Sequence, residues 1–282
     1  MFDLSVENEY GESLALTNNP AYVIKAIDGL NPPEAIINTT LRAGHDGSLF
    51  NSAYLDNRLL TITLAINFPA ERNRNILYSF FQSGKKSRIY YKNGTRDVYI
   101  DGYGQSMPIG FFDEKEICQV SLLCPDPYFH DLSDSYATND QITPGLEFPV
   151  EFPAAGIAFS TVELGSNILI ENKGNTETGI AVTFTASGAF SNPVLTNADT
   201  GEYFGVNTTM ASGNVLVFDS NIDSRAVYQV SSGTKTSKVG AIKSGSTWLM
   251  CKPGVNRFTI SGTGDIKDLY CSVVLQNKYQ GV

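Results

Sequence analysis

The residue types that most often carry catalytic or metal chemistry are scarce in this chain. It contains two histidines, His45 and His130. A histidine can act as a general base beside a serine and an aspartate, or bind a metal together with carboxylates or thiolates. The sequence places no such partners at a recognisable spacing, and spacing alone does not decide whether the fold brings a serine, a histidine and an aspartate together. His45 lies in a turn-forming segment and His130 opens a polar one, so both are interpreted as solvated loop side chains.

Two acidic segments, Asp113–Glu116 and Asp219–Asp223, hold carboxylates that could flank a glycosidic bond. They are interpreted as solvated turns. The segment Gly84–Ser87 resembles a phosphate-binding loop, but Ser79 stands where the first glycine belongs and Lys86 where a serine or threonine should follow the lysine. The sequence therefore predicts no catalytic residue, no cofactor and no metal site, and the chain is predicted not to be an enzyme.

The cysteines and the single tryptophan fit a structural role. The four cysteines form no CxxC pair and are too few for the disulfide framework of a small secreted domain, so free thiols are expected at Cys118, Cys124, Cys251 and Cys271. An exposed tryptophan on a β-sandwich could be a platform for sugar binding. The apolar neighbours of Trp248 instead favour a buried side chain.

Composition and charge limit the classes of protein that remain. The chain has 282 residues, of which 42% are hydrophobic and 17% charged, which predicts two folded domains. Its net charge of -9 predicts no stable nucleic-acid binding, because such binding depends on neutralising phosphates with lysine and arginine. No run of 18 apolar residues and no secretory signal occur, so we expect synthesis in the cytoplasm and no membrane partner.

The first half of the chain predicts strands around a single helix. Residues 59–66 and 117–124 alternate as strands, and 69–82 has the proline start and apolar spacing of a helix. Residues 88–100 predict a hairpin with a two-residue Asn93-Gly94 turn, which would place Ile89 opposite Val98. A further long hairpin is expected between Asn31 and Phe50.

The second half predicts an antiparallel β-sandwich. Residues 131–153 are first polar and then proline-spaced without a period, so they are interpreted as a linker. From 154 onward, short β-prone runs alternate with turn residues and no helical pattern occurs. The predicted domains are therefore 1–130 and 154–282, joined by 131–153.

The order of these segments resembles the distal tail protein (Dit) family of long-tailed, siphovirus-type bacteriophages and prophages. The resemblance spans nearly the whole chain, and its most specific stretch is Val120–Phe129. The other motifs are Asp46-Gly47-Ser48 after the long hairpin, Arg58 before an alternating strand, residues 100–103, Ile170–Asn175, Pro193–Asn197 and Pro253–Ile260.

The resemblance implies a mostly β protein with an N-terminal β-sandwich, one helix and a projecting hairpin, followed by a C-terminal galectin-like β-sandwich. It implies a structural virion protein that forms a hexameric ring at the distal end of the tail. The ring would join the tail tube protein to the tail-tip protein and to receptor-binding or fibre proteins, with DNA passing through its channel.

A hairpin that clamps the next subunit would supply the head-to-tail contact that a ring needs. The predicted subunit interface is therefore Asn31–Phe50, and its residues are Ile36, Ile37, Leu41, Asp46 and Gly47. Two alternatives stay open. A galectin-like sandwich could be a carbohydrate-binding module of a host-adhesion apparatus, and a β-sandwich glycosidase ranks last.

Overall fold

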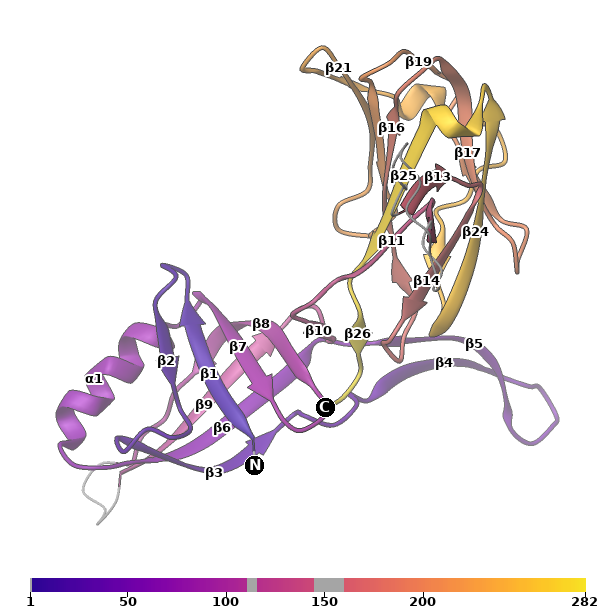
Figure 1. The fold of residues 1–282 in the computed structure, drawn as a ribbon. Coiled ribbons are helices and arrows are strands. Elements are labelled where there is room, and N and C mark those ends of the chain that lie inside the picture. The colour runs from indigo at the N-terminus through magenta and orange to yellow at the C-terminus, as the bar shows by residue number, and fades with distance from the viewer. Residues whose placement is uncertain (1, 111–115, 145–159) are drawn as a thin grey trace, which may run out of the picture. The chain divides into compact units, whose positions relative to one another are not determined.

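The computed structural model of the chain describes residues 2–110, 116–144 and 160–282 (Figure 1). These residues form two compact units. The first unit comprises Met1–Leu132 together with Lys278–Val282, and the second comprises Ser133–Asn277. Each unit has its own hydrophobic core.

The two units differ from the predicted domains at both ends of the second one. In the predicted linker 131–153, β11 (Ser135–Thr138) pairs with β25 (Leu269–Leu275), so this part is a strand of the second unit. At the end of the chain, β26 (Lys278–Tyr279) pairs with β10 (Phe129–Asp131) in the first unit. Both partners are more than a hundred residues away in sequence, so local patterns could not indicate either pairing.

The first unit is built on one nine-stranded antiparallel sheet with the order β2-β1-β7-β8-β9-β6-β3, and β10 pairs with β8 and β26. The strands not yet given are β1 (Asp3–Asn8), β2 (Ser13–Ala15), β3 (Tyr22–Asp28), β6 (Arg58–Ile66), β7 (Lys86–Lys92), β8 (Asp97–Ser106) and β9 (Glu116–Cys124).

The core of the first unit lies on one face of this sheet. Register places Ile62 opposite Val120 and Leu64 opposite Cys118, and all four side chains are buried. The helix α1 (Ala70–Phe80) adds Leu77 and Phe80 to the same core. The predicted helix 69–82 and the predicted strands 59–66 and 117–124 are therefore confirmed.

The turn of the β7–β8 hairpin differs from the prediction. Lys92 pairs with Asp97 and Ile89 with Ile100, so the loop has four residues and the predicted pairing of Ile89 with Val98 is wrong. The cause is the side chain of Asn93, whose Oδ1 accepts hydrogen bonds from the backbone N–H groups of Thr95 (2.9 Å) and Arg96 (2.8 Å). This side-chain turn replaces the tight turn, which would have needed positive φ angles.

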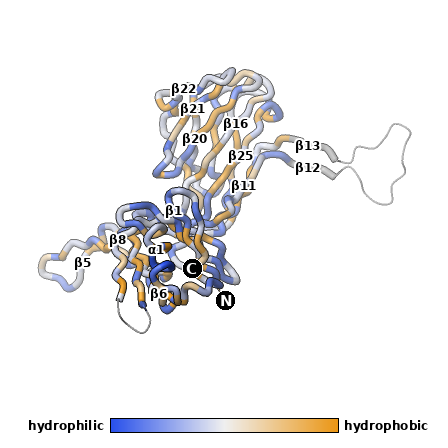
Figure 2. The backbone as a smooth tube through the Cα atoms, turned by 90° about the vertical axis from the view of Figure 1, so that its left-hand side faces the viewer, coloured by the Kyte–Doolittle hydropathy of each residue, from blue (hydrophilic) through white to orange (hydrophobic). Residues whose placement is uncertain are grey.

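The second unit is a β-sandwich. One sheet has the order β11-β25-β16-β20-β21-β22, the other β14-β24-β17-β18 with β19 beside β17, and their apolar faces enclose one core. Figure 2 shows hydrophobic and hydrophilic residues alternating along strands such as β16 and β25. Within the described residues, the predicted fold class is confirmed: mostly β, with one α-helix, a projecting hairpin and a C-terminal sandwich.

The second unit contains thirteen further strands and two 3-10 turns among its described residues, and their bounds follow. They are β12 (Asp140–Pro144), β13 (Ser160–Leu164), β14 (Asn167–Asn172), β15 (Thr178–Gly179), β16 (Ala181–Ala186), β17 (Phe190–Asn197), β18 (Tyr203–Gly205), β19 (Thr209–Met210), β20 (Val215–Asp219), β21 (Ala226–Ser231), β22 (Thr234–Ser237), β23 (Met250–Cys251), β24 (Gly254–Thr263) and the 3-10 turns Val239–Ala241 and Ile266–Asp268. The pairs β12–β13 and β15–β23 are separate ribbons.

All four cysteines are buried free thiols, as predicted. Burial raises the pKa of Cys118, Cys124 and Cys251 to about 12 and raises that of Cys271 as well. Because the thiolate is the reactive form, a thiol-specific reagent at mildly alkaline pH should modify none of them in the native protein and all four after unfolding. Mass spectrometry of the labelled protein checks this expectation, and rapid labelling of a native thiol would contradict it.

Candidate assembly interface

The hairpin formed by β4 (Ala35–Leu41) and β5 (Ser48–Leu55) extends away from the nine-stranded sheet as a separate two-stranded ribbon (Figure 1). Every residue of β4 is exposed, and all of β5 is exposed except the half-buried Leu55. An isolated two-stranded ribbon is at best marginally stable in water. The hairpin therefore lacks a covering partner among the described residues of the first unit.

One face of the hairpin carries its three most exposed large apolar side chains. Side chains alternate between the two faces of a strand, so Ile37 and Leu41 share a face, and Phe50 joins them because it pairs with Thr39. We call Ile37, Leu41 and Phe50 the hairpin face. Their exposed fractions are 62%, 86% and 66%. Large apolar side chains gathered at this exposure are typical of protein interaction sites.

Within the described residues, the two long edges of the hairpin also lack strand partners. The strand order places β4 and β5 only beside each other, so each has one free row of backbone N–H and C=O groups. Neither strand contains a charged residue or a proline, the features with which proteins usually protect such edges. The hairpin can therefore contribute both apolar contact and backbone pairing to a neighbouring molecule.

The structure separates the predicted interface residues into three positions. Ile37 and Leu41 lie on the hairpin face, whereas Ile36 lies on the opposite face, where it pairs with Tyr54. Asp46 and Gly47 are exposed in the tip between the strands, and Gly47 has a φ of 83° that favours glycine. Phe50 ends the predicted range Asn31–Phe50, and the sequence prediction did not single it out as an apolar anchor.

Arg58 fixes the root of the hairpin. Its side chain is buried, with 2% exposure, and it donates hydrogen bonds to the carbonyl oxygens of Asn31 (2.7 Å) and Gly29, which lie just before β4. It also donates to the carbonyl oxygens of Pro127 (2.7 Å) and Gln280. One guanidinium thus ties together the entry to the hairpin, its exit, the end of β9 and the C-terminal segment.

A glycine makes this root possible. Gly29 has a φ of 94°, and a Cβ atom built on it would collide with the carbonyl oxygen of Leu59. Only a residue without a side chain lets the two chain segments approach so closely at the base of the hairpin.

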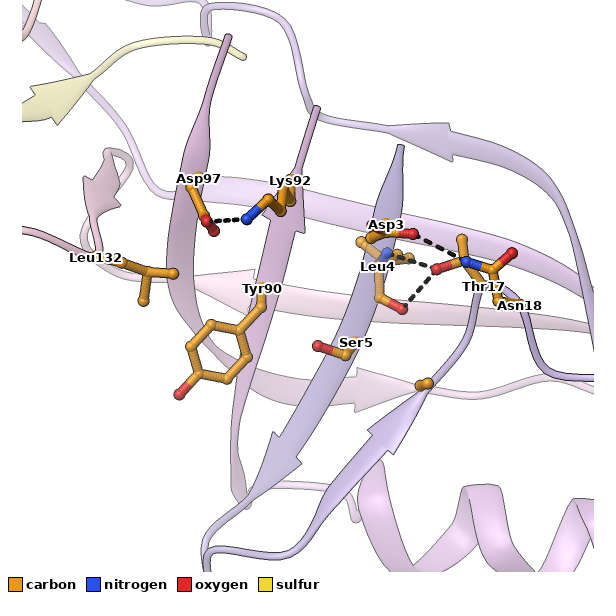
Figure 3. A pocket seen from close by; sticks show the side chains of 10 residues that line it. Asp3, Leu4, Ser5, Thr17, Asn18, Tyr90, Lys92, Asp97 and Leu132 are labelled. Carbon is orange, nitrogen blue, oxygen red and sulfur yellow. Dashed lines mark hydrogen bonds and ion pairs between the residues drawn. The ribbon is translucent and has the colours of Figure 1, made fainter. Parts of the chain in front are cut away.

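One cavity of the first unit has charged side chains that are already paired or hydrogen-bonded. It has a volume of about 520 Å³ and lies over β1, β7 and β8 (Figure 3). Lys92 Nζ lies 2.6 Å from Asp97 Oδ2, and Asn18 Nδ2 donates to Asp3 Oδ1 at 3.0 Å. Because these groups satisfy one another, the cavity offers a bound molecule little new hydrogen bonding.

The histidines behave differently from each other. His45 is exposed in the hairpin tip, as predicted. The prediction of a solvated His130 is wrong: it lies in β10 with 13% side-chain exposure, its ring stacks on Tyr99 at 5.3 Å, and its Nε2 lies 3.0 Å from Asp126 Oδ2. Burial raises the pKa of Asp126, but hydrogen bonding to His130 and the charge of Lys278 outweigh it, and the pKa falls to about 2.

The two acidic segments singled out in the sequence differ in what the structure describes of them. Asp219 accepts hydrogen bonds from Asn221 (2.8 Å) and Ser224 (2.5 Å), so it stabilises its own turn. Asp113–Lys115 lie outside the described residues. The described part of the chain contains no group of three or more side chains suited to a metal ion, and none of its helices is long and apolar enough to cross a membrane.

Comparison with known proteins finds a family model that matches part of the second unit and solved structures that resemble the whole chain. Residues 173–273 match the family model described as "Siphovirus-type tail component, C-terminal domain". The structure of SPP1 Dit, described as a paradigm of the hub adsorption apparatus in phages that infect Gram-positive hosts, aligns over 99% of this chain and 99% of its own, with a TM-score of 0.68 and 12% identity. A chain of the phage p2 baseplate in its activated conformation with Sr aligns over 100% of both chains, with a TM-score of 0.51 and 7% identity.

No curated protein is similar enough in sequence to count as a match. The structural likeness shows that the whole chain has the fold of SPP1 Dit. With the family match in the second unit, the predicted resemblance to the siphovirus distal tail proteins is confirmed.

Proposed function

We propose that this protein is the structural hub at the distal end of a phage tail, where copies of it form a ring. The observation that carries the proposal is the β4–β5 hairpin, which combines an exposed apolar face with unprotected edges. The likeness to a protein described as a hub of the adsorption apparatus supports the choice of this setting for the contact.

The hairpin favours a ring over a two-fold dimer. The hairpin of one copy and the surface that it covers on the next are different surfaces, and a contact of this heterologous kind generates a ring when the rotation closes. The ring is hexameric in this proposal.

The remaining roles are those that the resemblance to the distal tail proteins implies. The ring joins the tail tube protein on one side to the tail-tip protein on the other, and the second unit carries receptor-binding or fibre proteins. DNA passes through the channel without stable binding, because a net charge of -9 per chain disfavours phosphate contacts. The protein is made in the host cytoplasm and resides in the virion.

Native mass spectrometry of the purified full chain tests the assembly. We expect a species of about six times the 30.7 kDa chain mass that forms without any ligand. Light scattering over a dilution series provides a second measurement of the same mass. A mass of one chain at every protein concentration would contradict the proposed ring.

A further inference from the structure

A cavity of about 290 Å³ opens on the second unit, and none of its lining residues belongs to the hairpin or its root. It is lined by Glu177, Thr200, Glu202, Trp248, Met250 and Lys252. The lining combines one aromatic ring with two carboxylates, an ammonium group and a hydroxyl. Binding sites for small molecules typically have this composition, an apolar platform with a few polar groups that converge on it.

The ribbon β15–β23 places three of these side chains. Thr178 pairs with Cys251, and both are buried against the sandwich. Because successive side chains of a strand point to opposite faces, the neighbouring residues Glu177, Met250 and Lys252 point outward. Two strands that anchor the core thus present a carboxylate, a thioether and an ammonium group to the cavity.

The turn between β17 and β18 forms the opposite wall. The side chain of Asn197 accepts hydrogen bonds from the backbone N–H groups of Asp199 (2.9 Å) and Thr200 (3.2 Å). Thr200 Oγ1 donates to Glu202 Oε2 at 3.2 Å. These bonds hold the Thr200 hydroxyl and the Glu202 carboxylate in place before any molecule binds.

Trp248 is held in position as well, and the prediction that it is buried is wrong. It is half-buried, with its ring centroid 4.9 Å from that of the buried Phe204 and 5.3 Å from the guanidinium carbon of Arg225. A fixed aromatic ring loses little conformational freedom when a molecule packs on it, which favours binding.

Two of the charged groups of the cavity are available to a bound molecule. The Glu177 carboxylate and the Lys252 ammonium group make no hydrogen bond or ion pair with the described residues, and both line the cavity. Unpaired acceptors and donors in a cavity that an aromatic ring also lines match a molecule that has both apolar C–H groups and hydroxyl groups.

We propose that this cavity binds a neutral saccharide, whose C–H groups contact the part of Trp248 that lines the cavity. Glu177 and Glu202 accept hydrogen bonds from sugar hydroxyls, and Lys252 donates one. The mixed lining favours a hydroxyl-rich neutral molecule: each sugar hydroxyl both donates and accepts hydrogen bonds, so one molecule can bond to the carboxylates and to the ammonium group together. The site lies entirely in the second unit, so it does not depend on ring formation.

Tryptophan fluorescence reports directly on this cavity, because Trp248 is the only tryptophan of the chain. The full chain is applied to an array of neutral oligosaccharides, and the component monosaccharides of the strongest responders are then titrated while tryptophan fluorescence is recorded. We expect a saturable fluorescence change with at least one sugar. The Glu177→Gln/Glu202→Gln double variant should bind that sugar about tenfold or more weakly, because each amide loses a charged acceptor.

Glu171→Gln is the matched control, because Glu171 is an exposed carboxylate on β14 that does not line the cavity. It should bind like the parent chain. No array or fluorescence response to any sugar would overturn the proposal, as would equal sugar binding by the double variant with its circular dichroism spectrum unchanged. A fluorescence response to short peptides in place of sugars would assign the cavity to protein docking instead.

Discussion

Replacing Ile37 and Phe50 with aspartate should convert the ring into folded monomers. In a single copy both side chains are largely exposed, at 62% and 66%, so the substitutions should change the stability of the monomer by less than about 0.5 kcal/mol. In the ring, each would lose an apolar anchor and bury a carboxylate, at a cost of about 2 kcal/mol or more per contact. Native mass spectrometry should show the mass of one chain, with the melting temperature unchanged.

Two control variants make this expectation specific. Ile222→Asp removes a side chain that is 73% exposed on the second unit, and the ring should persist. Ile36→Asp changes the opposite face of the hairpin, where the side chain is 37% exposed, and should weaken the ring less than the double variant. An intact ring in the Ile37→Asp/Phe50→Asp variant would show that the hairpin face is not the contact.

Elements with local signals could be predicted from the sequence. The helix α1 follows from a proline start and apolar residues at helical spacing, and the buried face of β9 follows from strict alternation from Cys118 to Cys124. The β7–β8 turn shows the limit of such signals. Asn93-Gly94 is a strong turn signal, yet one side-chain oxygen competing for two backbone N–H groups changed the loop length and the register.

The hairpin face shows how a single irregularity limits prediction of the interface. Ile36 pairs with Tyr54, and continuing that register would place Phe50 opposite Thr40, on the face of Ile36. A bulge between Asn38 and Thr39 shifts the register by one residue and moves Phe50 to the face of Ile37. No residue pattern in this uncharged segment indicates where such a bulge lies, so Phe50 could not be assigned from the sequence.

The buried Arg58 could not be interpreted from its sequence position either, because its partners are brought together only by the fold. Its four carbonyl acceptors include one that is 222 positions away in the chain. It makes these contacts beside the ring of Phe129, whose centroid lies 4.7 Å from the guanidinium carbon. Burial lowers the pKa of this arginine, and the carbonyl oxygens replace the water that it gives up.

Replacing Arg58 with methionine should therefore strongly destabilise the first unit. Methionine preserves much of the side-chain volume but leaves the carbonyl groups of Gly29, Asn31, Pro127 and Gln280 without this donor. At about 1 kcal/mol or more for each buried polar group left unpaired, we expect a loss of at least about 3 kcal/mol. The melting temperature of the first unit should fall on the order of 10 °C.

Arg58→Lys separates charge from geometry, since it retains the positive charge but carries a single ammonium group in place of a planar fork. It should recover only part of the lost stability. Lys92→Met is the matched control because it removes a cation of the same unit whose ion pair with Asp97 is exposed, and its effect on the melting temperature should be small. Because Arg58 fixes both ends of the hairpin root, Arg58→Met should also reduce the fraction of chains in the ring. Equal stability of the Arg58→Met and Lys92→Met variants would show that the guanidinium does not hold the root.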